Sequence, residues 1–144
     1  MHELDNITPL EQLQYDGKVT YAQATSRLSS YWRNTEKSWS ELLQKLSVTT
    51  RTQETIAEYN TMKKAEQSEI KDVGGFVGGY LKEGKRRKGY VMNRSMLTLD
   101  IDFADENMDE IIEMFFSHAY AVYSTHKHRA TTPRLRFVVP LKRH

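Results

Sequence analysis

The chain has 144 residues, which suits one domain with a single core and is short for two. Its 21 Lys and Arg against 19 Asp and Glu give a net charge of +2, so net charge alone does not indicate nucleic-acid binding. The lack of cysteine excludes disulfides and thiolate metal sites and favours a reducing compartment. With neither a signal-peptide pattern nor an apolar run of about 20 residues, a cytoplasmic protein that does not bind membranes is expected.

Residues 1–70 are predicted to form a polar, helical N-terminal segment that packs on the rest of one compact domain. After an unpatterned tail, apolar spacing and capping signals predict three helices, at residues 20–34, 38–46 and 52–70. At the start of the second, Ser38 and Glu41 have the spacing of a capping box. Trp32 and Trp39 are expected to pack these helices together, with base stacking as the alternative.

Two glycine pairs, at 74–75 and 78–79, mark a change of texture within residues 71–80. They predict strand and turn geometry at places where the backbone approaches another group or takes a positive φ. A phosphate-binding loop is the weaker interpretation, since no Gly-Lys-Ser/Thr follows.

The charges are segregated along the second half of the chain. An exposed basic turn is predicted between Gly84 and Gly89, and it consists of Lys85, Arg86, Arg87 and Lys88. A solvated surface loop and a contact with a phosphate backbone both stay open for this turn. Acidic residues gather farther on, at 105–113, where they suit the first turns of a helix.

The last third of the chain has the clearest pattern. We predict a strand at 96–103, a helix at 107–118 capped by Asp105, and strands at 119–124 and 134–141. This β-α-β-β order is the first part of a ferredoxin-like (RRM-like) split β-α-β unit, in which the third strand lies between the first two. The expected fold class is therefore α+β, a helical N-terminal part followed by a partial sheet that occupies residues 71–144.

Polar residues recur at the strand ends with one residue between them. Side chains alternate between the faces of a strand, so Asp100 and Asp102 should point the same way while Leu97, Leu99, Ile101 and Phe103 point into a core. The same rule places two arginines of the last strand on its polar side. We predict that three polar pairs share one open surface: Asp100 with Asp102, Arg134 with Arg136, and Ser124 with His126.

This set of groups suits a metal-bound polyphosphate. Carboxylates are hard ligands for Mg²⁺ or Mn²⁺, and arginine and histidine can hold phosphate oxygens. Taken alone, an Asp-x-Asp at a strand end is more often a solvated terminus or a helix cap. His126 and His128 have the spacing of a zinc pair, yet no third zinc ligand is obvious nearby.

At these residues the chain resembles the archaeo-eukaryotic primase superfamily, in particular primase-polymerases of phages and mobile elements of Gram-positive bacteria. The first family motif, an apolar run ending in Asp-x-Asp, is matched at 97–102, and the second, a small residue, any residue and histidine, at 124–126. The phage subgroup is also similar at 71–80 and 132–140. The resemblance spans most of residues 30–144.

The resemblance implies DNA-dependent synthesis of primers or DNA from nucleoside triphosphates. It implies Asp100 and Asp102 as Mg²⁺ or Mn²⁺ ligands, and His126 as a contact of the incoming triphosphate. Ser124 would shape that pocket, and Arg134 and Arg136 would bind phosphate or template. The family's third motif, a further acidic ligand, has no place before the end of this sequence, which implies an N-terminal portion that is weak or inactive alone.

Two other functions stay open. One is a catalytically dead stand-alone relative, acting in the bacterial host cytoplasm as an inhibitor or regulator that binds nucleic acid or protein. Its open sheet edge would receive a protein partner or form a homodimer. The other is a small metal-dependent nuclease.

Overall fold

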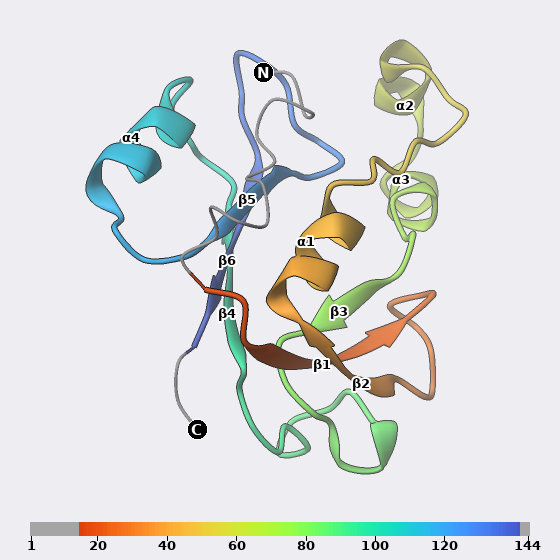
Figure 1. Cartoon of the computed structure of the whole chain (residues 1–144). Coiled ribbons are helices and arrows are strands. Elements are labelled where there is room, and N and C mark those ends of the chain that lie inside the picture. Colours follow the sequence, from red (N-terminus) through yellow and green to blue (C-terminus); the bar gives the residue numbers. More distant parts are fainter. Residues whose placement is uncertain (1–14, 142–144) are drawn as a thin grey trace.

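The computed structural model describes residues 15–141 and confirms the α+β class (Figure 1). Its elements are, in chain order, β1 (Lys18–Ala24), β2 (Arg33–Ser38), α1 (Trp39–Leu46), α2 (Ile56–Thr61), α3 (Lys64–Ile70), β3 (Gly75–Val77), a 3-10 turn (Lys82–Gly84), β4 (Met96–Ile101), α4 (Met108–Phe115), β5 (Ala121–Ser124) and β6 (Leu135–Pro140). Most of the tail expected before residue 18 lies outside the described residues. Within them, no helix is long and apolar enough to cross a membrane.

The first sheet replaces a predicted helix. Strands β2, β1 and β3 form an antiparallel sheet in that order, so the helix expected over 20–34 is wrong. The sequence does contain a strand pattern here, because Val19 and Tyr21 alternate with polar residues. In the structure both side chains are buried. The helical spacing was misleading, since it relied on Leu28 and Tyr31, which are 80% and 65% exposed around the turn between β1 and β2.

The capping box before α1 is confirmed. The Ser38 hydroxyl accepts a hydrogen bond from the Glu41 backbone N–H at 3.2 Å, and the Glu41 carboxylate accepts one from the Ser38 N–H at 2.8 Å. The helix expected over 52–70 is instead two short helices, because the backbone of Met62 is extended. At the start of α3 the Glu66 carboxylate accepts a hydrogen bond from the Lys63 backbone N–H at 3.0 Å.

The second sheet has the predicted topology. Its order is β4-β6-β5, with β6 antiparallel to both neighbours, so the third strand of the β-α-β-β unit does lie between the first two (Figure 1). Helix α4 connects β4 to β5 and begins after Asn107. The predicted cap by the Asp105 side chain is wrong, since no side-chain hydrogen bond caps this helix. Only the Asp105 carbonyl is used, accepting from the Met108 N–H at 3.1 Å.

One core joins the two sheets through α1. Trp39 and Leu42 of this helix pack with residues of β1 and with Met96 and Val138 of the second sheet. Trp32 is buried in a separate cluster, with Ala22 and Leu81. Both tryptophans are therefore packed, as predicted, but against sheets and not between helices.

The apolar side of β4 is not the core side, which corrects the sequence prediction. The register pairs Met96 with Pro140 and Thr98 with Val138, so the buried Met96 and Val138 share the face of Asp100. On the other face Leu97 and Leu99 are 41% and 45% exposed, and Phe103, beyond the strand, is 94% exposed. The first sheet and α1 cover the face that bears Asp100. The face that was predicted to be open is therefore the covered one, and the face of Leu97 and Leu99 is the more exposed one.

Both structural reasons proposed for the paired glycines are confirmed. Gly74 has a φ of +85°, a backbone conformation that residues with a side chain rarely adopt. A Cβ added to Gly79 would overlap the backbone carbonyl of Asn93. At Gly75, in contrast, an added Cβ meets nothing within 4 Å.

Gly79→Ala should therefore destabilise the protein by about 1–3 kcal/mol, the usual cost of forcing an atom into a packed site. Gly75→Ala is the matched control and should change the free energy of unfolding by less than about 0.5 kcal/mol. Urea unfolding followed by tryptophan fluorescence measures both. Equal effects of the two substitutions would contradict the close approach of the chain at Gly79.

Candidate functional site

All six sheet-derived candidates line one cavity. This cavity has a volume of about 1920 Å³ and lies between the second sheet and the segment that runs from α1 to α2. Asp100, Asp102, Ser124, His126, Arg134 and Arg136 are all among its lining residues. It exceeds the roughly 300–1,000 Å³ of ordinary small-molecule pockets.

Strand register brings together the first aspartate–arginine pair of the cavity, Asp100 with Arg136. Asp100 of β4 lies opposite Arg136 of β6, which lies opposite Tyr123 of β5. The Arg136 Nε donates to Asp100 Oδ1 at 2.6 Å. Burial raises the pKa of Tyr123, with Arg136 lowering it in part. Burial would lower the pKa of Arg136, but Asp100 and Tyr123 outweigh this and raise it, so its guanidinium stays charged.

In the second pair, Asp102 with Arg134, the charged atoms are farther apart than in the first. Asp102 lies just beyond the end of β4, and its Oδ1 is 3.8 Å from an Arg134 terminal nitrogen. Their side chains are 52% and 37% exposed. Both predicted aspartates thus face a predicted arginine.

Ser124 departs from the expected arrangement. It pairs with Leu135, so its side chain belongs to the sheet face of Leu135, opposite the face that carries Arg136. It reaches the cavity because β5 ends there. The three polar pairs therefore meet at the strand ends, and not on one face of the sheet as predicted.

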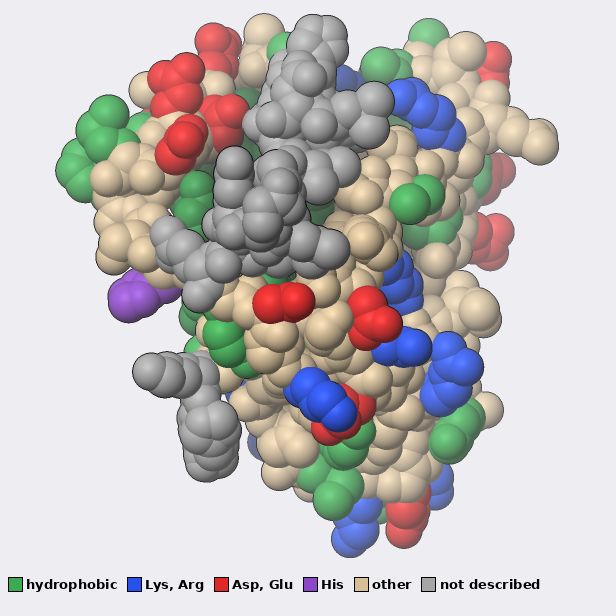
Figure 2. All heavy atoms as spheres, in the orientation of Figure 1, with side chains coloured by type: hydrophobic (Ala, Val, Ile, Leu, Met, Phe, Trp, Pro, Cys, Tyr) green, Lys and Arg blue, Asp and Glu red, His purple; other side chains and the backbone are tan. Residues whose placement is uncertain are grey.

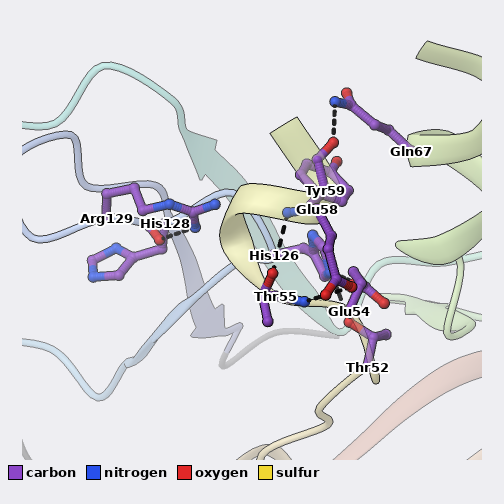
Figure 3. Close-up of polar contacts among 9 residues, drawn as sticks. All are labelled: Thr52, Glu54, Thr55, Glu58, Tyr59, Gln67, His126, His128 and Arg129. Carbon is purple, nitrogen blue, oxygen red and sulfur yellow. Dashed lines mark hydrogen bonds and ion pairs between the residues drawn. The ribbon is translucent and has the colours of Figure 1, made fainter. Parts of the chain in front are cut away.

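His126 is held by a segment that the sequence analysis did not connect with it (Figure 3). Its Nε2 lies 3.3 Å from the Thr52 hydroxyl and 3.6 Å from a Glu54 carboxylate oxygen, and its ring packs on Tyr59 with centroids 4.9 Å apart. No sequence pattern links residues that are 74 positions apart, so Thr52 and Glu54 were missed. His128 turns elsewhere, its Nδ1 accepting from the Arg134 N–H at 3.2 Å.

The electrostatic setting favours an anionic ligand. Lysines and arginines outnumber acids among the lining residues by eight to five. Several of the cations, among them Arg51 and Lys127, have no carboxylate within 4.0 Å among the described residues. A polyphosphate or nucleic-acid backbone would complement this charge.

The carboxylates fit a divalent cation that completes its coordination with phosphates. The part of the chain that the structure describes holds no group of three or more His, Cys, Asp and Glu placed to bind a metal. Mg²⁺, however, is commonly bound by one or two carboxylates, water and substrate phosphates. Asp100 and Asp102 supply that smaller donor set, each with one oxygen directed to an arginine.

The basic turn is not part of this cavity. Lys85, Arg86, Arg87 and Lys88 are exposed and absent from its lining, and their turn lies at the lower end of the molecule in Figure 1, away from α2 and β5. Two of its side chains rest on rings: the Arg87 guanidinium is 4.2 Å from the Tyr90 centroid and that of Arg86 is 5.2 Å from the Trp32 centroid.

Figure 2 shows acidic side chains gathered over α4, so the predicted charge segregation is visible on the surface.

Comparison with protein families gives a match over nearly the whole chain. The model of the VapE N-terminal domain matches residues 4–144. The chain belongs to the VapE N-terminal domain family. This domain is associated with phages and mobile elements, and VapE is related to primase-like proteins. Comparisons with curated proteins and with solved structures found no match. Membership of this VapE N-terminal domain in the archaeo-eukaryotic primase superfamily stays a prediction.

The Glu54 carboxylate should make the folded state of this VapE N-terminal domain sensitive to acid. A hydrogen bond from the Thr52 hydroxyl and the nearby His126 lower the Glu54 pKa below its ordinary value of 4.5. Its contribution to stability is therefore present above about pH 4.5 and is lost as the pH falls through the lower, folded-state pKa. The difference in unfolding free energy between wild type and Glu54→Gln should shrink below this pH.

Urea unfolding at a series of pH values from 7 to 3.5 measures this difference. Glu106→Gln, which removes an exposed carboxylate, is the control and should show no comparable pH dependence. A wild-type advantage over Glu54→Gln that grows on acidification would refute the assignment.

Proposed function

We propose that this domain binds a nucleoside triphosphate together with Mg²⁺ or Mn²⁺, as the N-terminal portion of a phage-type primase-polymerase that acts on a DNA template in the host cytoplasm. The observation that carries the proposal is the meeting of two aspartates, two arginines and a histidine at one basic cavity. The relation of VapE to primase-like proteins supports it.

The proposed roles follow from the chemistry of each group. Asp100 and Asp102 hold the metal, which, when bound, neutralises phosphate charge during nucleotidyl transfer. Arg134 and Arg136 hold phosphate oxygens, and His126 contacts the triphosphate. Ser124 shapes the pocket at the end of β5. The cavity volume leaves room for a template nucleotide beside the triphosphate.

The ion pairs imply an exchange of partners on binding. In the free domain each aspartate is next to an arginine. A metal-bound triphosphate satisfies both, because the carboxylates can turn to the cation while the guanidinium groups turn to the phosphates. These pairs are partly exposed, and such pairs contribute only about 0.2–1 kcal/mol, so the exchange is not prohibitive. Metal and triphosphate should therefore favour each other's binding by a factor of up to about five.

Calorimetric titration with Mn²⁺, a nucleoside triphosphate or both tests this coupling. Arg136→Gln should strengthen binding of Mn²⁺ alone, because Asp100 is released, and weaken binding of the triphosphate severalfold. Asp102→Asn should weaken the Mn²⁺-dependent part, and His126→Ala the triphosphate part. Lys64→Ala, at an exposed lysine of α3, is the control. The proposal fails if the wild-type domain binds neither the metal nor the triphosphate at millimolar concentrations.

We also propose that the basic turn contacts the phosphate backbone of DNA. Its side chains are exposed, and Arg86 and Arg87 are held by aromatic rings. Each lost phosphate contact should reduce the slope of log affinity against log salt by about 0.7–0.9. Replacing Lys85 and Lys88 with Ala should thus flatten the slope by about 1.4–1.8 in total, whereas Lys64→Ala should leave it unchanged. Equal slopes for all three proteins in fluorescence-anisotropy titrations would exclude this role.

The alternative function is a catalytically inactive relative that inhibits or regulates by binding nucleic acid or protein. The specific observation in its favour is that the aspartates already have arginine partners and that the described residues offer no third acidic metal ligand. A protein partner or a second copy would then add to an edge strand of the second sheet, β4 or β5. Normal primer synthesis by a longer VapE chain carrying Asp100→Ala would favour this alternative, and loss of synthesis would favour the enzyme.

A further inference from the structure

We propose that Glu54 is the positioning residue of His126: it holds the imidazole with its Nε2 proton directed at the wall of the cavity and its Nδ1 available to the ligand. This inference rests on the proposed function, since it concerns how the same cavity meets a phosphate group. No sequence motif contains both residues, and only the fold brings Glu54 next to His126.

The contacts around the ring define its orientation. Nε2 is the nitrogen that faces the Glu54 carboxylate, at 3.6 Å, and the Thr52 hydroxyl, at 3.3 Å. The Thr52 hydroxyl itself donates to the same carboxylate oxygen. Thr52 is therefore available to His126 only as an acceptor, so both neighbours of Nε2 require a proton on that nitrogen.

The carboxylate is fixed and ionised at neutral pH. Its side chain is only 11% exposed, and the lowered pKa of Glu54 keeps it charged. Glu54 directly precedes Thr55, the N-cap residue of α2, and a capping box joins Thr55 to Glu58. The helix is tied in turn to α3, because Gln67 Nε2 donates to the Tyr59 carbonyl at 2.8 Å (Figure 3). Glu54 thus sits on a braced segment, which is what a positioning residue needs.

Tyr59 adds a second, independent sign that this corner of the cavity receives a polar ligand. Its ring packs on the ring of His126, and it lines the cavity. The residue is 4% exposed, yet its hydroxyl has no hydrogen-bond partner among the described residues. Buried polar atoms are rarely left unpaired, and a bound ligand oxygen or an ordered water is the usual partner.

This orientation has a chemical consequence. With its Nε2 proton directed at Thr52 and Glu54, the ring can donate to a phosphate oxygen only through Nδ1, and only when Nδ1 also carries a proton. The doubly protonated ring then lies between two anions, the carboxylate on one side and the phosphate on the other. Without Glu54 the ring would be free to rotate or to change tautomer, and part of its alignment toward the ligand would be lost.

Nitrogen NMR of the imidazole tests the orientation without any ligand. In wild type the neutral ring of His126, assigned with His126→Gln, should be the Nε2–H tautomer. Glu54→Ala should give a mixture of tautomers. Glu54→Gln, whose amide oxygen can still accept a hydrogen bond from Nε2, should restore the wild-type signature. Glu69→Gln is the control, because it removes an exposed carboxylate of α3 and leaves the capping box of α2 intact. A wild-type tautomer in Glu54→Ala would overturn the proposal.

Titration with inorganic tripolyphosphate separates this inference from the function on which it rests. Glu54→Ala should bind the probe about tenfold more weakly than wild type, because the imidazole loses its charged partner. Glu69→Gln should bind it as wild type does. If wild type binds no tripolyphosphate while its tautomer still depends on Glu54, the proposed function fails and the positioning role stands. If wild type binds it and Glu54→Ala binds it equally well, the positioning role fails.

Discussion

The placement of β6 between β4 and β5 determines which side chains can meet in the cavity. Because β6 is antiparallel to both neighbours, Arg136 lies opposite Asp100 on one side and Tyr123 on the other. A shift of either register by one residue would move the arginine to the other sheet face, away from both partners. The core secures this register, since Met96 and Val138 of the same face are fully buried beneath α1 and β1.

Much of this half of the structure could be predicted because its signals are local. Alternation of polar and apolar residues identified β4 and β6, and the β-α-β-β order gave the position of the central strand. The capping box at Ser38 likewise needs only four consecutive residues. The face that would be buried could not be predicted in this way, because it depends on where α1 and the first sheet pack. Leu97 and Leu99 are the more apolar side of β4, yet they are the more exposed one.

The remaining errors have the same origin. Residues 20–34 carry both a helical and an alternating apolar pattern. The pairing of β1 with β2 and with β3, which lies about 50 residues farther along the chain, decided between them. Ser124 shows the limit of a motif, because a fixed spacing to His126 did not reveal that its side chain lies on the other face from Arg136. Glu54 shows the limit of any local analysis, since only the fold brings it to His126.

In the free cavity Asp100 and Asp102 already have arginine partners, and this constrains how a ligand can be received. Asp100 and Arg136 are 53% and 35% exposed, so their contact is closer to a surface ion pair than to a buried one and costs little to open. A deeply buried pair would resist exchange, because each charge would have to be left without a partner in a medium of low polarity. Partial exposure removes that obstacle, and the loss of one partner is compensated by water until a ligand arrives. Under the proposed function, binding replaces one set of charge pairs by another, and the residues of each pair act as a unit. For the same reason the effects of substituting Asp100 and Arg136 are not expected to add, and a double variant is needed to assign an effect to either residue.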